Sequence, residues 1–189
     1  MSNKLITLPN EHLRQRSKKV GLINESVLKI IKDMKNATID WEESREHEVG
    51  VALAGVQIDK LLRIVIIRED TEHKDNKNFL TFINPEISKY EGELVEDFEG
   101  CLSIKDVYGK VPRYSKVRVK AIDEHGKPIK IKAEGFLARI FQHEIDHTNG
   151  IVFIDHIKDS KDAFYQLAND GKLESLNYDE HVKNNSILW

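Results

Sequence analysis

The chain has 189 residues, of which 40% are hydrophobic and 32% are charged, and its formal net charge is -3 with a pI near 6.3. These values suit one globular domain with a sizeable core, and they give no electrostatic basis for nucleic-acid binding. No apolar run reaches the ~18 residues of a membrane span, no targeting leader is visible, and the lone cysteine suits a reducing compartment, so we expect a cytoplasmic protein.

The first third of the chain contains one helical pattern and one strand pattern. Residues 1–22 mix apolar and charged side chains and are expected to form an arm along the surface. Apolar residues recur at helical spacing over 26–46, with Ser26 as the N-cap. Residues 50–57 are small and favour a loop, and the continuous apolar run at 61–68 predicts a buried strand.

The middle of the chain favours antiparallel strands. Short strands are expected at 79–83 and 93–98, interrupted by the Asn-Pro pair that follows the first of them. Residues 115–123 alternate apolar and cationic side chains, and with the similar alternation at 129–132 they predict a hairpin. We interpret its lysines as a solvated face.

A second helix is predicted over 135–148, ended by Asn149 and Gly150. A short strand at 151–154, a third helix at 161–167 and a polar, irregular tail from 171 complete the chain. The pattern predicts a single-domain α+β fold, with antiparallel strands packed around one central helix.

That central helix carries the strongest chemical signal, Gln142-His143-Glu144-Ile145-Asp146-His147. On a helix, His143 and His147 lie one turn apart on the same face and can bind one metal ion. Glu144 beside them can take a proton from water held by that ion. Such a pair also arises by chance on charged helices, so it does not decide the function alone.

A third metal ligand has to come from another part of the chain. The metzincin pattern would need a histidine at Phe153 and is therefore excluded. His156 is out of register, and Glu174 has no supporting motif around it. Cys101 is the better candidate, although a lone cysteine is more often a small buried side chain. One thiolate and two imidazoles leave a fourth position open for water and suit Zn²⁺ or Fe²⁺.

Taken together, the motifs resemble those of the peptide deformylase family. Glu99-Gly100-Cys101-Leu102-Ser103 and the segment 142–147 match two family motifs in full and in the family's order. Residues 50–57 resemble the first motif, Gly-x-Gly-Leu-Ala-Ala-Pro-Gln, and depart from it at Ala52, Gly55 and Val56. The resemblance extends over about residues 5–157.

The resemblance implies a metal-dependent hydrolase that removes the formyl group from the N-terminal methionine of newly synthesised proteins. One Fe²⁺ per chain, replaceable by Zn²⁺, Ni²⁺ or Co²⁺, would be held by Cys101, His143 and His147. Hydroxide formed at the metal would attack the formyl carbon, with Glu144 as general base and acid and with formate as product. The backbone N–H of Leu102 and the side-chain amide of Gln57 would bind the oxyanion.

The same resemblance implies where the substrate lies. The methionine side chain is expected in an apolar pocket formed by Val51, Phe136 and Ile140 near Tyr108, and the peptide backbone along Gly50, Val51, Ala52 and Gly100. The departures in the first motif then predict a changed substrate fit with the catalytic groups intact. Residues 1–170 would form the catalytic domain and 171–189 a polar tail. We expect a monomer acting on formylmethionyl nascent peptides at the ribosome, without direct nucleic-acid contact and without membrane binding.

Several points stay open at this level. Glu99 and Arg113 either pair to brace the cysteine loop or are two solvated charges, and Asp146 either orients a ligand histidine or faces solvent. A zinc peptidase and a catalytically weak, deformylase-like binding protein are the alternatives to an active deformylase.

Overall fold

The computed structural model describes residues 4–43, 45, 48–71, 73, 75–168 and 170–189. These residues contain the helices α1 (Glu25–Glu43) and α2 (Gly135–Thr148). They also contain one antiparallel sheet made of β1 (Ala52–Ala54), β2 (Ile64–Arg68), β3 (Phe79–Cys101), β4 (Ile104–Ile122), β5 (Pro128–Glu134), β6 (Phe164–Leu167) and β7 (Leu173–Ser175). The strand order is β1-β2-β3-β4-β6-β7, with β5 also paired to β4. The α+β class and the antiparallel sheet are as predicted.

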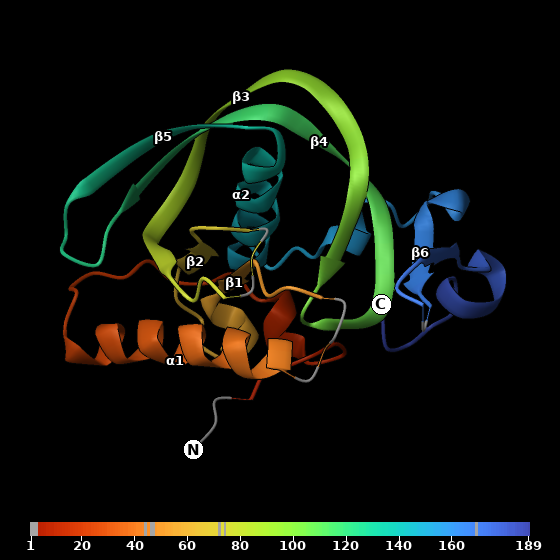
Figure 1. Ribbon diagram of the computed structural model, residues 1–189, viewed down its shortest axis with the longest axis horizontal. Coiled ribbons are helices and arrows are strands. Elements are labelled where there is room, and N and C mark those ends of the chain that lie inside the picture. The colour runs from red at the N-terminus through yellow and green to blue at the C-terminus, as the bar shows by residue number, and fades with distance from the viewer. Residues whose placement is uncertain (1–3, 44, 46–47, 72, 74, 169) are drawn as a thin grey trace.

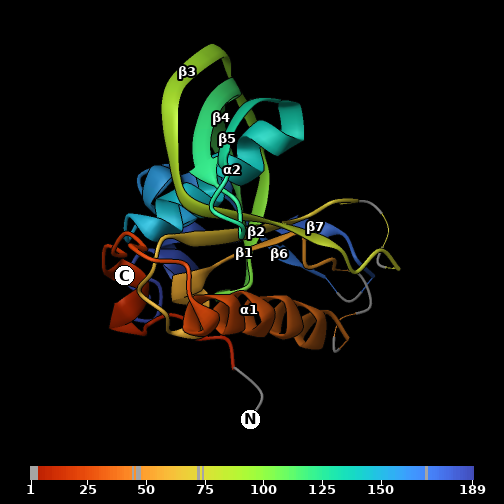
Figure 2. The same cartoon turned by 90° about the vertical axis from the view of Figure 1, so that its left-hand side faces the viewer.

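Strands β1 and β2 lie between the two helices, with α2 on one side and α1 on the other (Figures 1 and 2). Successive residues of β2 face opposite sides. Val65 and Ile67 join the core around α2, whereas Ile64 and Ile66 join the core beneath α1. Because both faces are buried, the strand has to be apolar at every position, which explains the uninterrupted run in the sequence.

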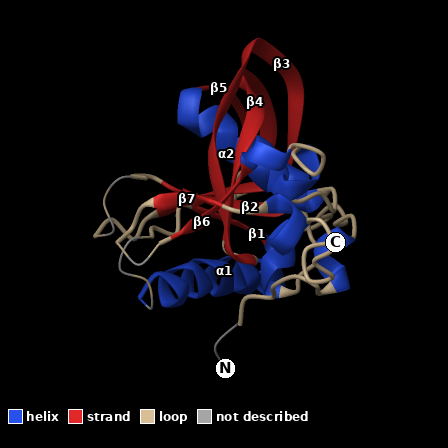
Figure 3. Ribbon diagram, turned by 90° about the vertical axis from the view of Figure 1, so that its right-hand side faces the viewer, coloured by secondary structure: helices blue, strands red, loops and turns tan. Residues whose placement is uncertain are grey.

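The long strands β3 and β4 form a curved hairpin that arches over α2 (Figures 1 and 3). The prediction of two separate strands at 79–83 and 93–98 was wrong, since β3 runs without a break from Phe79 to Cys101. The Asn-Pro pair falls in a register shift between Ile83 and Glu86, where Asn84 has a φ of 53°. A bulge accommodates proline without ending the strand. Strand β4 likewise begins earlier than the predicted residue 115.

Helix α1 differs from its prediction at the cap. The side chain of Asn24, and not that of Ser26, accepts the backbone N–H of Val27 at 3.1 Å, so Asn24 caps the helix. Ser26 instead donates its hydroxyl to Asn24 at 2.6 Å. The helix ends at Glu43, and residues 44, 46 and 47 of the predicted segment and its flank lie outside the described residues.

Two segments predicted as irregular contain short regular elements. The arm at 1–22 includes the 3-10 helix Glu11–Arg14, with Leu13 fully buried, and residues 1–3 lie outside the described part. The predicted loop at 50–57 contains β1 and then the 3-10 helix Gly55–Ile58. None of the described helices is both long and apolar enough to cross a bilayer.

The C-terminal predictions were largely wrong. The segment 151–154 leads into the 3-10 helix Phe153–His156, and 161–167 forms a single 3-10 turn followed by β6. Strand β6 pairs with β4 at Tyr108 and Gly109, and this tertiary pairing overrides the local helical pattern. The tail contains β7 and the π-helical turn Tyr178–Val182. Its Val182 and Leu188 are buried in the core around α2, so the tail packs onto the domain.

Candidate metal centre

Helix α2 carries two histidines toward the end of β3. One side of the helix packs Ala138, Phe141 and Ile145 into the core. His143 and His147 lie one turn apart, with ring centroids 5.0 Å apart and ring planes at 73°. Cys101 is the last residue of β3, and its Sγ lies 3.2 Å from Nε2 of His147. The ligand atoms of Cys101, His143 and His147 all lie within 4.8 Å of one another.

This arrangement fits a divalent transition-metal ion. Metal bonds of ~2.0–2.3 Å in a tetrahedral site place neighbouring S and N ligands ~3.5 Å apart, close to the separation of Cys101 and His147. All three side chains are buried. Burial also lowers the pKa of His147, which keeps that ring neutral, as metal binding requires. Among the described residues, no other cluster of three or more His, Cys, Asp or Glu side chains has its ligand atoms this close together.

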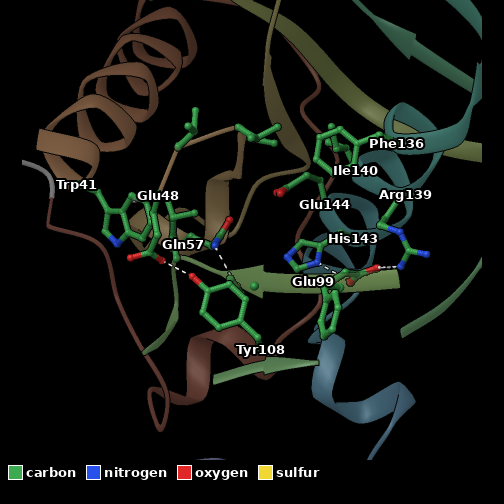
Figure 4. Close-up of a pocket in the computed structure, with 17 residues that line it drawn as sticks. Trp41, Glu48, Gln57, Glu99, Tyr108, Phe136, Arg139, Ile140, His143 and Glu144 are labelled. Atoms are coloured by element: carbon green, nitrogen blue, oxygen red, sulfur yellow. Dashed lines mark hydrogen bonds and ion pairs between the residues drawn. The ribbon is translucent and has the colours of Figure 1, made fainter. Parts of the chain in front are cut away.

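Glu99 fixes the orientation of the first histidine. Its Oε2 lies 2.9 Å from Nδ1 of His143, which leaves Nε2 of that ring free to face the metal position. The guanidinium groups of Arg113 and Arg139 donate to the same carboxylate, from Nε of Arg113 at 2.9 Å and from Nη1 of Arg139 at 2.8 Å. Figure 4 shows Glu99 between His143 and Arg139. The pairing of Glu99 with Arg113, one of two alternatives in the sequence, is therefore present and buried.

The charges in this network stabilise the ionised carboxylate. Burial by itself would raise the pKa of Glu99, but the hydrogen bonds and charges of His143 and Arg113 outweigh it and lower the pKa below its ordinary value. A carboxylate accepting from a ligand histidine raises the basicity of that ligand and fixes its tautomer.

Asp146 contacts this network without touching a ligand. Its carboxylate accepts from Nη1 of Arg113 at 2.5 Å and lies 2.7 Å from Nε2 of His156. It therefore acts on His143 only through Arg113 and Glu99. His156 is engaged by Asp146, and Glu174 is exposed on β7, so the structure brings neither of these two weaker ligand candidates into the cluster.

Glu144 lies beside the ligands with one oxygen unpaired. The side chain is buried, and its Oε2 has no hydrogen-bond partner among the residues that the structure describes. Burial raises the pKa of Glu144 to about 7. Such a group exchanges a proton readily near neutral pH, which is what a general base that later acts as an acid requires.

Gln57 approaches the cysteine from the other side. Its Oε1 accepts the backbone N–H of Ala54 at 2.8 Å, which fixes the orientation of the amide. The Nε2 group then points to the centre, 3.6 Å from Sγ of Cys101 and 3.2 Å from Oγ of Ser103. Leu102 lies next to the cysteine, in the two-residue connection between β3 and β4. Both residues line the same cavity as Glu144.

The cavity at the centre encloses about 270 Å³ (Figure 4). It brings together nearly all of the residues predicted to bind substrate, namely Val51, Ala52, Gly100, Phe136 and Ile140, with Tyr108. Gly50 is the exception. Its N–H donates to Glu42 at 2.8 Å and its carbonyl accepts from Arg68 at 3.0 Å, so both backbone groups serve the scaffold.

The departures from the family's first motif have a structural setting. A Cβ on Gly55 would lie 3.0 Å from the carbonyl oxygen of Leu62 and 3.1 Å from that of Lys60. Glycine at this buried position therefore permits a close approach of two backbone segments. Ala52 and Val56 are also buried, Ala52 on β1 and Val56 in the 3-10 turn.

Sequence reasoning missed one wall of the cavity. Trp41 falls within the helical pattern predicted over 26–46, and it lines the cavity with Glu48. The hydroxyl of Tyr108 donates to Glu48 at 2.5 Å, and Nη1 of Arg45 lies 2.7 Å from the same carboxylate. No motif marks these residues. The available signal was an aromatic residue at the end of the helix that directly precedes the first motif.

Comparison with known proteins agrees with this geometry. A family model described as polypeptide deformylase matches residues 2–163. The chain belongs to this family. It is 39% identical over 164 residues to the peptide deformylase of Thermomicrobium roseum, covering 85% of this chain and 89% of that protein. The peptide deformylase of Aquifex aeolicus is 39% identical over 160 residues, covering 84% and 89%.

Solved structures of the family show the same fold. The crystal structure of a peptide deformylase from Synechococcus elongatus in complex with actinonin superposes with a TM-score of 0.73 at 35% identity, covering 80% of this chain and 78% of that one. The crystal structure of a peptide deformylase from Legionella pneumophila superposes with a TM-score of 0.70 at 41% identity, covering 80% of this chain and 83% of that one. With its Cys-His-His cluster in place, the chain is a metal-dependent peptide deformylase that removes the N-formyl group from nascent peptides.

Proposed function

We propose that Glu144 moves the proton in this reaction, with Gln57 and Leu102 binding the developing oxyanion. A divalent ion held by Cys101, His143 and His147 would lower the pKa of water to ~7, and we propose Fe²⁺ for this role, with Zn²⁺, Ni²⁺ or Co²⁺ as substitutes. The observation that carries the proposal is the buried, unpartnered Oε2 of Glu144 in the cavity next to two ligand histidines.

The proton path follows from the position of Glu144. Its carboxylate accepts a proton from the attacking water as the oxygen bonds to the formyl carbon. The C–N bond then breaks, and Glu144 returns that proton to the departing amine nitrogen, giving formate and a free N-terminus. The pKa of about 7 allows both directions of transfer at neutral pH.

Gln57 has the geometry of a preorganised donor. Its carbonyl oxygen is held by the N–H of Ala54, so its NH₂ group is fixed toward Cys101 at the metal centre. A donor of this kind, fixed before the charge develops, typically contributes ~3 kcal/mol to the transition state. We assign the second donor to the backbone N–H of Leu102, which adjoins Cys101 at the end of the hairpin.

The methionine side chain is assigned to the apolar part of the cavity. Val51 and Ile140 line it together with Phe136, which is 53% exposed and so stands at the entrance. The substrate backbone is assigned to the edges at Ala52 and Gly100. Gly100 packs closely on Tyr108, because a Cβ there would lie 2.5 Å from the ring. The methyl group of Ala52, where the family pattern has glycine, would narrow this edge and shift the substrate.

We further propose that residues 1–170 form the catalytic unit, that 171–189 are an added segment, and that the chain acts as a monomer in the cytoplasm on formylmethionyl chains at the ribosome. The family match over residues 2–163 supports the extent of the unit. The single free Cys101 supports a reducing compartment, which would preserve the thiolate.

The test is formate release from formyl-Met-Ala-Ser under anaerobic conditions by protein loaded with Fe²⁺ or Ni²⁺. Glu144→Gln is expected to lower kcat by about 10²–10⁴-fold with metal content unchanged. Glu174→Gln is the matched control, since this exposed residue was the alternative carboxylate, and it should keep full activity. Cleavage of Met-Ala-Ser at a peptide bond would support a peptidase instead. Formate release by Glu144→Gln at the wild-type rate would refute the role of Glu144.

A further inference from the structure

A second cavity, of about 290 Å³, lies where the segment before α1 meets the start of β2 and the bulge of β3. Of the residues that the structure describes, none lines both this cavity and that of the metal centre. Four of its lining residues carry charge. Arg16, Lys19 and Arg63 are cations, and Glu86 is the one carboxylate among the described residues that line it. The cavity therefore has an excess of positive charge in a chain whose net charge is -3.

Arg63 is a buried cation held only by neutral acceptors. It is 7% exposed. Its Nη1 donates to Oδ1 of Asn149 at 2.8 Å and to the carbonyl of Thr148 at 3.4 Å, and its Nη2 donates to the carbonyl of Pro85 at 3.3 Å. Burial lowers the pKa of Arg63, the charge of Arg16 lowers it further, and the charge of Glu86 offsets part of this effect. Buried guanidinium groups are normally paired with an anion.

Ser17 provides a second, independent observation. The residue is 5% exposed and lines the same cavity, and its hydroxyl oxygen has no hydrogen-bond partner within the described part of the chain. Its backbone N–H donates to the carbonyl of Thr148 at 2.9 Å, which holds the residue in place. Buried hydroxyl groups are rarely left without a partner, because the loss of hydration is uncompensated.

The end of α2 explains only part of this arrangement. Arg63 donates to the carbonyl of Thr148, the last residue of that helix, and a cation there is favourable to the helix dipole. Arg16 and Lys19 are exposed, and neither forms an ion pair with any residue that the structure describes. Capping of the helix therefore accounts for Arg63, but not for the two further cations or for the hydroxyl of Ser17.

We propose that this cavity binds a phosphate group, either free or as part of a phosphate ester. The buried guanidinium of Arg63 and the hydroxyl of Ser17 supply hydrogen bonds from the inner wall. Arg16 and Lys19 supply charge at the rim. Arginine suits a tetrahedral oxyanion because its planar fork matches two of the oxygens. Because the cavity is larger than one phosphate, it also leaves space for the esterified part of a ligand.

The direct test measures inorganic phosphate binding to the full-length, metal-loaded protein by calorimetry, against chloride at matched ionic strength. Arg16→Gln with Lys19→Gln is expected to weaken binding by at least about tenfold. Both side chains are exposed, so the double variant should fold, and phosphate bound at the metal would persist in it. Lys130→Gln with Lys132→Gln is the matched control, because these exposed lysines lie on the open β5 strand, and it should bind within about twofold of wild type.

Equal losses in the two double variants, or binding of phosphate no stronger than that of chloride, would overturn the proposal. A second arm separates the sources of the phosphate group. Tighter binding of adenosine monophosphate or of a short single-stranded RNA, lost on Arg16→Gln with Lys19→Gln, would identify a nucleotide phosphate. Binding of these probes no tighter than that of inorganic phosphate, again lost in that variant, would identify the free ion.

Discussion

Replacement of Glu99 by glutamine should lower the stability of the protein far more than the loss of an exposed ion pair would. The Glu99, Arg113 and Arg139 side chains are 4%, 5% and 7% exposed. Glutamine removes the negative charge that both guanidinium groups share, leaving Arg113 with Asp146 and Arg139 with backbone carbonyls. Removing one partner from a buried ion pair costs about 3–5 kcal/mol, because the remaining charge stays buried.

The expected effect on the thermal midpoint follows from chain length. At about 2–4 °C per kcal/mol for a domain of this size, the metal-free Glu99→Gln protein should unfold about 6–20 °C below wild type. Glutamine also replaces the charged acceptor that orients His143 by a neutral amide oxygen, so metal affinity, measured by competition with a chelator, should fall about 10–100-fold.

Glu91→Gln is the matched control. Glu91 accepts a similar fork from Arg118 at 2.6 Å and 3.0 Å, but the pair lies on the exposed surface of β3 and β4. Exposed pairs contribute little because water screens them, so this variant should melt close to wild type. The reasoning is refuted if Glu99→Gln changes the midpoint and the metal affinity no more than Glu91→Gln does.

Three further outcomes are expected. Removal of the metal by a chelator should abolish formate release and lower the thermal midpoint. Where the free ion was at 100 times its Kd, the free energy of unfolding should fall by about 2.7 kcal/mol. The thermal midpoint of Cys101→Ser should not depend on added metal. Partial burial alone would raise the pKa of Asp146, but His156 and Arg113 lower it below the ordinary value. The unfolded chain therefore takes up this proton first on acidification. The stability that Asp146 confers is present above about pH 5 and is lost as the pH falls through the folded pKa. The difference between the thermal midpoints of wild type and Asp146→Asn should therefore become smaller in acid. A difference that stays constant with pH would contradict this. Gly55→Ala should destabilise by about 1–3 kcal/mol in denaturant titration, since its Cβ would meet backbone at 3.0 Å, while Gly21→Ala, with open space around it, should be nearly neutral.

The ligand set was predictable because the identity of each residue carries its chemistry. Cys101, His143 and His147 are rare metal-binding side chains within two exact motifs, and the helical spacing of the histidines places them on one face whatever the rest of the fold does. The partners of Glu99 were not predictable to the same degree. Arg113 comes from β4 and Arg139 from α2, and only the arch of the hairpin over the helix brings both to one carboxylate.

Errors in the fold arose where tertiary pairing decided the structure. Phe164 and its neighbours have a helical pattern, yet the free edge of β4 near Gly109 takes them as a strand. Asn84 and Pro85 would end an isolated strand, but a long partner strand holds the chain on both sides of the bulge. Trp41 has the spacing of a core residue, and only the position of the following loop shows that it faces the cavity.

The centre joins two positions that are 46 residues apart in the chain, the tip of the long hairpin at Cys101 and the last turn of α2 at His147. A bound ion therefore links the sheet to the helix, as a disulfide would, and because it binds the folded arrangement it stabilises that arrangement by mass action. Unlike a disulfide, this tether opens whenever the ion departs or the sulfur is oxidised. Loss of the metal or oxidation of Cys101 is therefore expected to lower the stability of the fold, in addition to stopping turnover.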